Sequence, residues 1–262
     1  MTMTKNFKRF WPEKFITVII PTLNEEENID RVLETFNFEP TRKQLIIVDG
    51  GSVDKTVDKV KRYKRSSREY LNLKLIKSDG VTGKGYQMVR GYEEALGINL
   101  VYMDADLECN YGEVADKLAK PLLSGEAFFV KSTFDRGKEW GRVTKLTAKP
   151  LLDIFYPDLN FIEQPLSGQV AMKKTLQNQL ETPARYGVEV SHLIQYYGLY
   201  GLSHITQVDL GKVEHRHRQL DDLALTSQEV SKTILYHAYK DGKIDLKMPL
   251  LEKLQRGGLE MC

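Results

Sequence analysis

The chain of 262 residues has few cysteines and no long apolar segment. Its two cysteines, Cys109 and Cys262, are too few for a disulfide framework, and their spacing matches no zinc site. We therefore expect reduced thiols, which favours a cytoplasmic protein. No apolar run approaches the roughly 20 residues that cross a bilayer, so no stable membrane insertion is expected. The first eleven residues lack the apolar core of a signal peptide.

A strong net charge is also missing. The 38 lysines and arginines nearly balance the 36 aspartates and glutamates, which leaves a formal charge of +2. This balance gives no reason to expect nucleic acid as a partner, so any recognition of anions must be local. With 41% hydrophobic and 28% charged residues, the composition is that of a folded protein of one large domain.

Short apolar runs alternate with helical patterns in the first half of the chain. Runs rich in β-branched residues predict strands buried on both faces, at Ile16–Ile20, Gln44–Val48, Leu73–Ile76 and Leu100–Met103. Apolar residues at helical spacing predict helices, at Glu25–Phe36, Asp54–Tyr63 and Lys84–Leu96. This alternation predicts an α/β fold with a mainly parallel sheet, in which ligands bind beyond the carboxyl ends of the strands.

The second half is less regular. Strands are predicted at 128–134 and 205–210, and helices are predicted at 140–155, 190–197 and 220–239. A polar tail, residues 248–262, follows the last helix.

Two carboxylates separated by one small residue follow the fourth predicted strand, in Asp104-Ala105-Asp106. Alternate residues of an extended backbone point to the same side, so Asp104 and Asp106 can converge on one ion. Carboxylates this close repel each other unless a cation lies between them. A hard divalent ion such as Mg²⁺ or Mn²⁺ suits such a site, although an ordinary polar loop is also rich in aspartate.

Two other polar segments end predicted strands. Asn24 follows Pro21-Thr22-Leu23 and is expected to cap a helix whose first turn contains Glu25 to Glu27. A nucleoside contact at this place is an additional interpretation. The glycines of Asp49-Gly50-Gly51-Ser52 allow a ligand to approach the backbone closely, and Asp54 is expected to cap the next helix.

Three basic segments are candidates for anion binding. Lys84 opens a predicted helix but is not part of a P-loop, because the earlier glycine and the following serine or threonine are missing. Gly141-Arg142-Val143-Thr144 also begins a helix and could cradle a phosphate. In the segment 215–218, histidine and arginine alternate, which suits a metal or an anion. An exposed lysine, ordinary helix initiation and a solvated basic edge are the corresponding structural interpretations.

Taken together, these motifs resemble the GT-A fold of nucleotide-diphospho-sugar transferases, a Rossmann-like α/β fold. Three segments resemble the motif order of the family 2 superfamily: 20–26, 48–52 and 104–106. Four later segments resemble the glucosyl-3-phosphoglycerate synthases: 141–144, 164–166, 186–190 and 215–218. The resemblance covers roughly residues 14 to 240.

The resemblance implies a retaining, metal-dependent hexosyltransferase. It would move α-glucose from UDP-glucose or GDP-glucose to the 2-hydroxyl of D-3-phosphoglycerate, giving glucosyl-3-phosphoglycerate. The implied nucleotide-sugar contacts are Pro21, Thr22, Leu23, Glu26, Ser52, Lys84, Asp104 and Ala105. The implied metal ligands for Mg²⁺ or Mn²⁺ are Asp106 and His215. The implied acceptor contacts are Gly141, Arg142, Thr144, Tyr186 and His217. The implied catalytic residues are Glu189, Asp106 and Arg142.

The resemblance also implies a division of the chain into three parts. These are a nucleotide-sugar-binding subdomain (1–135), an acceptor-binding subdomain (136–225) and a C-terminal helix and tail (226–262). The long helix at 220–239 is expected to support a homodimer. At one position the chain departs from the family, which often has Asn where this sequence has His217. How the carboxylate of the acceptor is held is therefore open.

Several alternatives remain at this stage. Within the transferases, the acceptor could be a polyprenyl phosphate, or the enzyme could be a mannosyl-3-phosphoglycerate synthase. A nucleotidylyltransferase would need a glycine-rich loop that this chain lacks, and an NAD-dependent dehydrogenase would need Gly-x-Gly-x-x-Gly after the first strand. A nucleotide-sugar-binding module without turnover is the non-enzymatic alternative.

Overall fold

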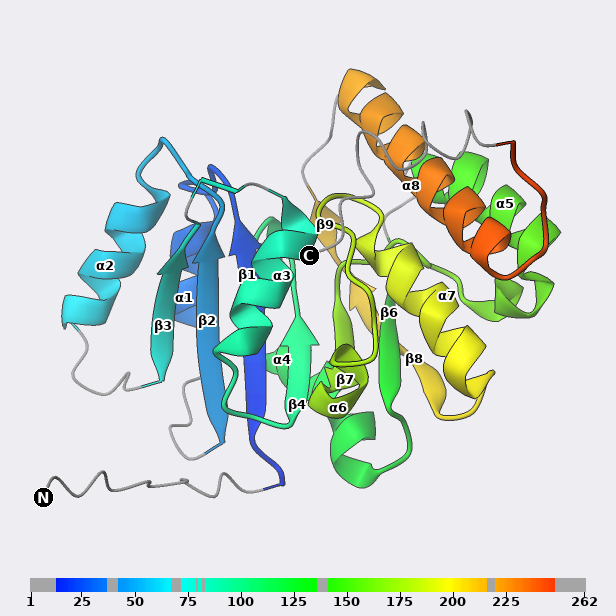
Figure 1. The fold of residues 1–262 in the computed structure, drawn as a ribbon. Helices are drawn as coiled ribbons and strands as arrows, with labels where there is room; N and C mark the ends of the chain where they lie inside the picture. The colour runs from blue at the N-terminus through cyan, green and yellow to red at the C-terminus, as the bar shows by residue number, and fades with distance from the viewer. Residues whose placement is uncertain are drawn as a thin grey trace, which may run out of the picture.

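The computed structural model describes residues 13–36, 42–66, 72–78, 80–81, 83–135, 141–215 and 220–247. Within them, seven strands form one sheet in the order β3-β2-β1-β4-β7-β6-β8 (Figure 1). The strands are β1 (Ile16–Thr22), β2 (Lys43–Asp49), β3 (Leu73–Lys77), β4 (Asn99–Tyr102), β6 (Phe129–Asp135), β7 (Val170–Lys173) and β8 (Ile205–Lys212).

One strand of this sheet runs against the others. The strands β1 to β4 pair in parallel, as do β6 and β8, whereas β7 is antiparallel to both of its neighbours. The predicted mainly parallel sheet is therefore confirmed. Two short strands, β5 (Leu107–Glu108) and β9 (Glu214–His215), form a separate antiparallel pair.

Helices cover both faces of the sheet. The α-helices are α1 (Ile29–Thr35), α2 (Thr56–Ser66), α3 (Lys84–Glu93), α4 (Tyr111–Ser124), α5 (Lys149–Phe155), α6 (Lys174–Gln177), α7 (Val188–Tyr200) and α8 (Leu220–Lys240). Two further segments are a π-helix, η1 (Thr144–Ala148), and a 3₁₀ helix, η2 (Pro157–Phe161). Figure 1 shows α3 and α7 in front of the sheet and α1 and α4 behind it.

The continuous apolar runs of the strands follow from this double cover. Successive side chains of a strand point to opposite faces. Val18 and Ile20 accordingly lie in the core that contains residues of α1 and α4, whereas Ile19 lies in the core that contains residues of α3 and α7. Because both faces are buried, most residues of the central strands are apolar. The buried polar ones, such as Thr17 and Lys131, are hydrogen-bonded.

The structure corrects the sequence prediction for the first helix. The helix α1 begins at Ile29, not at Glu25, and Asn24 is not its N-cap. Asn24 has a φ of 56°, and its Oδ1 accepts a hydrogen bond from the Val53 amide at 2.9 Å. Asparagine tolerates this left-handed conformation better than most residues, because its side chain can bond to nearby backbone.

Several elements of the structure were not predicted: β7, α4 and the short segments β5, β9, α6 and η2. The helix α4 has a capping signal in the sequence, since the Asn110 side chain accepts from the Glu113 amide at 3.0 Å. By contrast, β7 has only four residues, too few for a periodic pattern. Other predictions agree better with the structure. The predicted cap Asp54 accepts a hydrogen bond through Oδ1 from the Thr56 amide at 3.0 Å, and α8 spans the helix predicted at 220–239.

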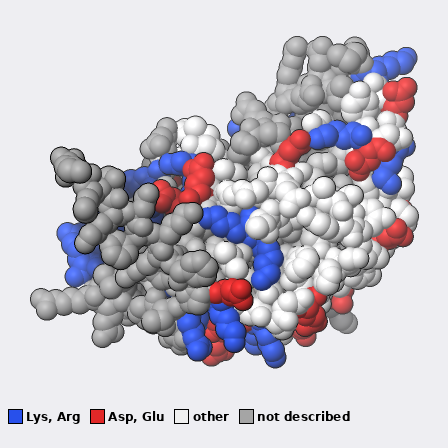
Figure 2. Space-filling view, turned by 60° about the horizontal axis from the view of Figure 1, so that its bottom comes forward, with Lys and Arg blue, Asp and Glu red and all other residues white. Residues whose placement is uncertain are grey.

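The helices η1, α5 and α8 form a layer beside the second half of the sheet (Figure 1). The face in Figure 2 carries basic and acidic side chains around a broad uncharged area, so its described residues form no wide surface of one sign. Across the described residues, no helix combines the length and the apolar character that crossing a bilayer requires.

Two histidines are buried between α7 and its neighbours. His192 Nε2 lies 2.9 Å from Thr182 Oγ1, and His237 Nε2 lies 2.8 Å from Ser191 Oγ. Burial, with the nearby charges of Lys131 and His237, lowers the pKa of His192 to about 3. Burial also lowers the pKa of His237 to about 4. Both imidazoles are therefore neutral in the folded protein at neutral pH.

Acid should destabilise the fold through these histidines. Only the unfolded chain binds protons on them near the reference pKa of 6.5, so the free energy of unfolding falls as pH drops from 6.5 toward 4. In His192→Gln this loss should be smaller by up to about 1.4 kcal/mol per pH unit. Urea denaturation at several pH values measures it. His204→Gln, at an exposed histidine, is the control and should keep the wild-type dependence. If His192→Gln kept the wild-type pH dependence, the conclusion that His192 is buried in its neutral form would be refuted.

Candidate active site

The loops that follow β1 and β2 are bonded to each other. Ser52 Oγ accepts from the Asn24 amide at 2.8 Å, and Glu26 Oε2 accepts from the Lys55 amide at 2.9 Å. In return, Asp54 Oδ2 accepts from the Glu26 amide at 3.0 Å. The polar residues that the sequence suggested as nucleotide contacts therefore hold one another in place and form one platform.

A buried glutamine ties this platform to the strands beneath it. Gln87 Nε2, on α3, donates to the carbonyl oxygens of Thr22 at 2.8 Å and Val48 at 2.9 Å. These carbonyls lie at the carboxyl ends of β1 and β2. Of the other predicted contacts here, Pro21 is partly buried and Leu23 is half exposed.

The predicted pair of carboxylates follows β4 at the same edge of the sheet. Asp104 and Asp106 are both partly buried, and Ala105 between them is buried. The Tyr111 hydroxyl donates to the Asp104 carbonyl oxygen at 3.1 Å, which anchors the backbone of the motif to α4. The aspartates therefore lie beside this platform, as the parallel strand order predicts.

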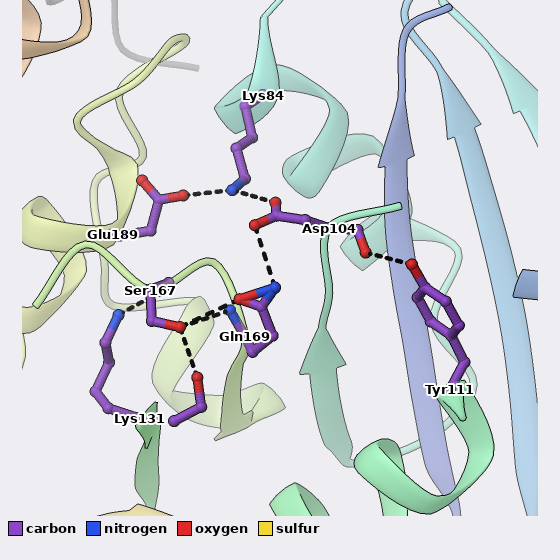
Figure 3. Close-up of polar contacts among 8 residues, drawn as sticks. Lys84, Asp104, Tyr111, Lys131, Ser167, Gln169 and Glu189 are labelled. Carbon is purple, nitrogen blue, oxygen red and sulfur yellow. Dashed lines mark hydrogen bonds and ion pairs between the residues drawn. The ribbon is translucent and has the colours of Figure 1, made fainter. Parts of the chain in front are cut away.

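Lys84 connects this motif to the second half of the chain. Its Nζ lies 2.5 Å from Asp104 Oδ1 and 2.5 Å from Glu189 Oε1 (Figure 3). Asp104 follows β4, Glu189 lies in the first turn of α7, and Lys84 opens α3. Three elements distant in sequence therefore meet at one ammonium group.

The charges of this cluster are unequal. Burial alone would lower the pKa of Lys84, but the charges of Asp104 and Glu189 more than offset it and raise the pKa above its ordinary value. Lys84 is therefore a stable cation. With Asp106 included, these four side chains contain one cation and three carboxylates, an excess that favours a further cation.

The segment 167–169 lies beneath Asp104 and is held by β6. Lys131 Nζ, fully buried, donates to the Ser167 carbonyl oxygen at 2.6 Å, and Ser132 Oγ lies 2.5 Å from Ser167 Oγ. Ser167 Oγ donates to Gln169 Oε1 at 3.1 Å, and Gln169 Nε2 donates to Asp104 Oδ2 at 3.3 Å (Figure 3). A chain of polar contacts thus runs from the sheet to the carboxylate.

A metal ion fits the acidic edge in part. Carboxylate oxygens are the ligands that Mg²⁺ and Mn²⁺ prefer. The strand pair β5–β9 places the backbone of His215 opposite Leu107, the residue after Asp106. The side chain of His215 is not among those described. The side chains that are described contain no group of three His, Cys, Asp or Glu residues that could hold a metal by itself.

The predicted acceptor residues lie around α8. Gly141 has a φ of 74° and precedes Arg142, which is exposed, and Thr144, which is partly buried. This segment leads into η1, where Thr147 Oγ1 lies 2.7 Å from Ser227 Oγ of α8. Two residues along α8, Glu229 accepts from the Tyr186 amide at 2.8 Å. His217 lies outside the described residues.

The start of α3 packs tightly against the segment before α7. The Tyr86 amide donates to the Ala184 carbonyl oxygen at 3.2 Å. A Cβ on Gly83 or Gly85 would lie well within 3.0 Å of the carbonyl oxygens of Ala184 or Pro183, so both positions require glycine. The Gly-Lys-Gly motif therefore brings the backbone of Lys84 up to the second half of the chain.

Sequence reasoning missed several residues of this region, namely Gln87, Lys131, Ser132, Ser167, Gly168 and Gln169. These residues belong to no recognisable sequence motif, so the sequence gives only a weak signal for them. The segment 167–169 reaches the site only because β7 runs antiparallel and begins at the edge where β4 ends.

The sheet order, the aspartate motif after β4 and the platform of the β1 and β2 loops beside it are typical of the GT-A class of nucleotide-sugar transferases. The family model of glycosyl transferase family 2 matches residues 17–179. The glucosyl-3-phosphoglycerate synthase of Petrotoga mobilis is 32% identical over 254 residues, an alignment that covers 91% of this chain and 78% of that protein. The chain belongs to glycosyl transferase family 2 and, within it, to the glucosyl-3-phosphoglycerate synthase family.

Solved structures of a relative agree with this assignment. The glucosyl-3-phosphoglycerate synthase of Mycobacterium tuberculosis, in complex with Mn²⁺, UDP-glucose and phosphoglyceric acid, is 32% identical with a TM-score of 0.77. The match covers 86% of this chain and 80% of that chain. A second structure of that protein contains Mg²⁺ and UDP, and its TM-score is 0.76. The expected family and the GT-A-like fold are therefore confirmed.

Proposed function

We propose that this protein is a metal-dependent glucosyltransferase that moves glucose from UDP-glucose or GDP-glucose to D-3-phosphoglycerate. The observation that carries the proposal is the Lys84 ammonium between Asp104 and Glu189, beside the nucleotide platform. This cluster brings together an ammonium that can bind a diphosphate and carboxylates that can bind a metal ion and a sugar. The ligands in the relative's structures support the same sugar donor and acceptor. A polyprenyl-phosphate acceptor and a mannosyl donor are the less favoured alternatives.

The predicted residues divide into a sugar-donor side and an acceptor side. On the donor side, Thr22, Leu23, Glu26 and Ser52 belong to the platform, and Lys84 faces the diphosphate. On the acceptor side, Gly141, Arg142 and Thr144 bind the phosphate of the acceptor, and Tyr186 and His217 are the other proposed acceptor contacts. The subdomains 1–135, 136–225 and 226–262 follow this division, although α8 begins before the last boundary.

Asp106 and His215 are the proposed metal ligands, with Asp104 in a supporting role. The bound Mg²⁺ or Mn²⁺ neutralises charge that develops on the departing diphosphate, as a Lewis acid. Lys84 adds a second positive charge at the same place. Both contributions lower the barrier because the leaving group is more negative in the transition state than in the bound substrate.

The transfer is proposed to retain the α configuration. Glu189 lies near the transferring sugar, on the side of α7, where its carboxylate stabilises positive charge on the ring. The acceptor hydroxyl attacks from the face that the diphosphate leaves, and its proton passes to the departing phosphate. Arg142 holds the acceptor phosphate during this step, since a guanidinium binds phosphate through paired hydrogen bonds.

A matrix of sugar donors and acceptors tests the activity. UDP- and GDP-linked glucose and mannose are incubated with 3-phosphoglycerate or glycerate, with and without Mg²⁺. We expect metal-dependent turnover with a glucose donor and 3-phosphoglycerate, and much slower turnover with glycerate, which lacks the phosphate that Arg142 binds. Proton NMR of the product should show an α linkage. No turnover of 3-phosphoglycerate with any donor would refute the substrate, and a β linkage would refute retention.

Removal of one aspartate tests the metal site. Asp106→Ala should lower metal-dependent turnover by on the order of 100-fold or more, because a bound Lewis acid contributes several kcal/mol. The variant should also lose the rise in melting temperature that Mn²⁺ gives the wild-type protein, since only a bound ligand stabilises the fold. Glu34→Ala, at an exposed position of α1, is the matched control and should behave as wild type. An Asp106→Ala protein that Mn²⁺ still stabilises would contradict the assignment.

We further propose a cytoplasmic homodimer. Cys109 is a free cysteine among the described residues, as is usual in a reducing compartment. Leu146, Ile154 and Leu225 are large exposed apolar residues on η1, α5 and α8, the helical layer that a second copy would cover. Light scattering should give twice the mass of the 30.1 kDa chain. The mass of a monomer at micromolar concentration would refute the dimer.

A further inference from the structure

Gly168 lies directly beneath the Lys84–Asp104 ion pair. In the antiparallel pairing of β4 with β7, Tyr102 lies opposite Val170. Continuing this register by two residues places Gly168 opposite Asp104. Side chains at opposite positions of antiparallel strands lie close together, so a residue here has little room beside the aspartate.

A side chain at this position would enter the ion pair. A Cβ built on Gly168 lies 2.5 Å from Lys84 Nζ and closer still to Asp104 Oδ2. The φ of Gly168 is not positive, so the backbone itself does not require glycine. Glycine is present here because of the space that the ammonium and the carboxylate occupy.

We propose that Gly168 is a positioning residue for glucosyl transfer. Because Gly168 has no side chain, the Lys84 ammonium and the Asp104 carboxylate can occupy the space next to it. Gly168 therefore determines the position of the ammonium relative to the diphosphate. The inference rests on the proposed function, because the diphosphate belongs to the sugar donor.

The backbone around Gly168 cannot easily move away from an added methyl group. Ser167 is held through its carbonyl oxygen by Lys131, which is fully buried. On the other side, the Gln169 carbonyl oxygen accepts from the Ser132 amide at 3.1 Å. The clashing atoms, by contrast, are the ends of two flexible side chains. A methyl group therefore displaces Lys84 and Asp104 while the fold is kept.

Gly168→Ala tests the proposal, with Gly198→Ala as the matched control. Gly198 lies in α7, has no positive φ and would meet nothing within 4 Å as alanine. Three quantities are measured for both: the urea midpoint, the Kd for UDP at fixed Mn²⁺ by calorimetry, and kcat and KM for both substrates. Gly168→Ala should keep a midpoint close to wild type but weaken UDP binding about 10-fold or more, since its charged contact is misplaced. The KM for 3-phosphoglycerate should change less. Gly198→Ala should leave the UDP affinity and kcat unchanged.

A double-mutant cycle separates positioning from a general disturbance. In a Lys84→Ala background the methyl group meets no ammonium, and Asp104 is free to turn into the vacated space. Gly168→Ala should therefore cost less UDP affinity there than in the wild-type background. An equal loss in the two backgrounds would overturn the proposal.

The remaining outcomes are also decisive. Unchanged UDP affinity and turnover in Gly168→Ala would overturn the positioning role and leave the proposed function intact. Failure of Gly168→Ala to fold would also overturn it, because the added methyl group would then have displaced the backbone and not only the ends of the Lys84 and Asp104 side chains. A wild-type protein that binds no UDP would instead refute the proposed sugar donor, and the inference with it.

Discussion

The site depends on one shared positive charge. A single ammonium, that of Lys84, neutralises carboxylates from two parts of the chain, Asp104 after β4 and Glu189 in α7. Without it, the buried carboxylate of Glu189 and the partly buried carboxylate of Asp104 would face each other and repel. The two halves of the sheet are joined by the pairing of β4 with β7 and by the apolar core on each face, and this ion pair adds a polar contact at the edge where the strands end.

The reversed strand β7 supplies the lower part of the site. A parallel strand in this position would have brought its carboxyl end to the active edge. Because β7 runs the other way, the residues that precede it, Ser167 to Gln169, arrive there instead, next to Asp104. These residues carry small or neutral side chains, which suits a position beside an ion pair. The direction of one short strand therefore determines which residues lie beneath the carboxylate.

The sequence predicted most residues of the sugar-donor side, but few of the contacts that hold these residues in place. The buried strands and the aspartate motif were predictable, because apolar runs and strand ends are local signals. The place of Asn24 was not, since its partner Val53 lies in another loop. Lys84 was predicted as an anion-binding residue at a helix start and, through the family resemblance, as a nucleotide-sugar contact. Its pairing with Glu189 was not predictable, because it requires the folded sheet. The predicted roles of Arg142, Thr144 and His217 stay predictions that only experiments on the acceptor can test.

The tight packing of Gly83 and Gly85 against Pro183 and Ala184 has a consequence for how Lys84 can change partners. Because the start of α3 is bonded to the segment that leads into α7, the backbone of Lys84 is held against the second half of the chain. Only the four-carbon side chain is free to turn from one anion to another. The Lys84 ammonium is paired with two carboxylates, and its side chain is largely buried. A change of partner therefore requires these ion pairs to break, but it requires no rearrangement of the backbone that carries the lysine.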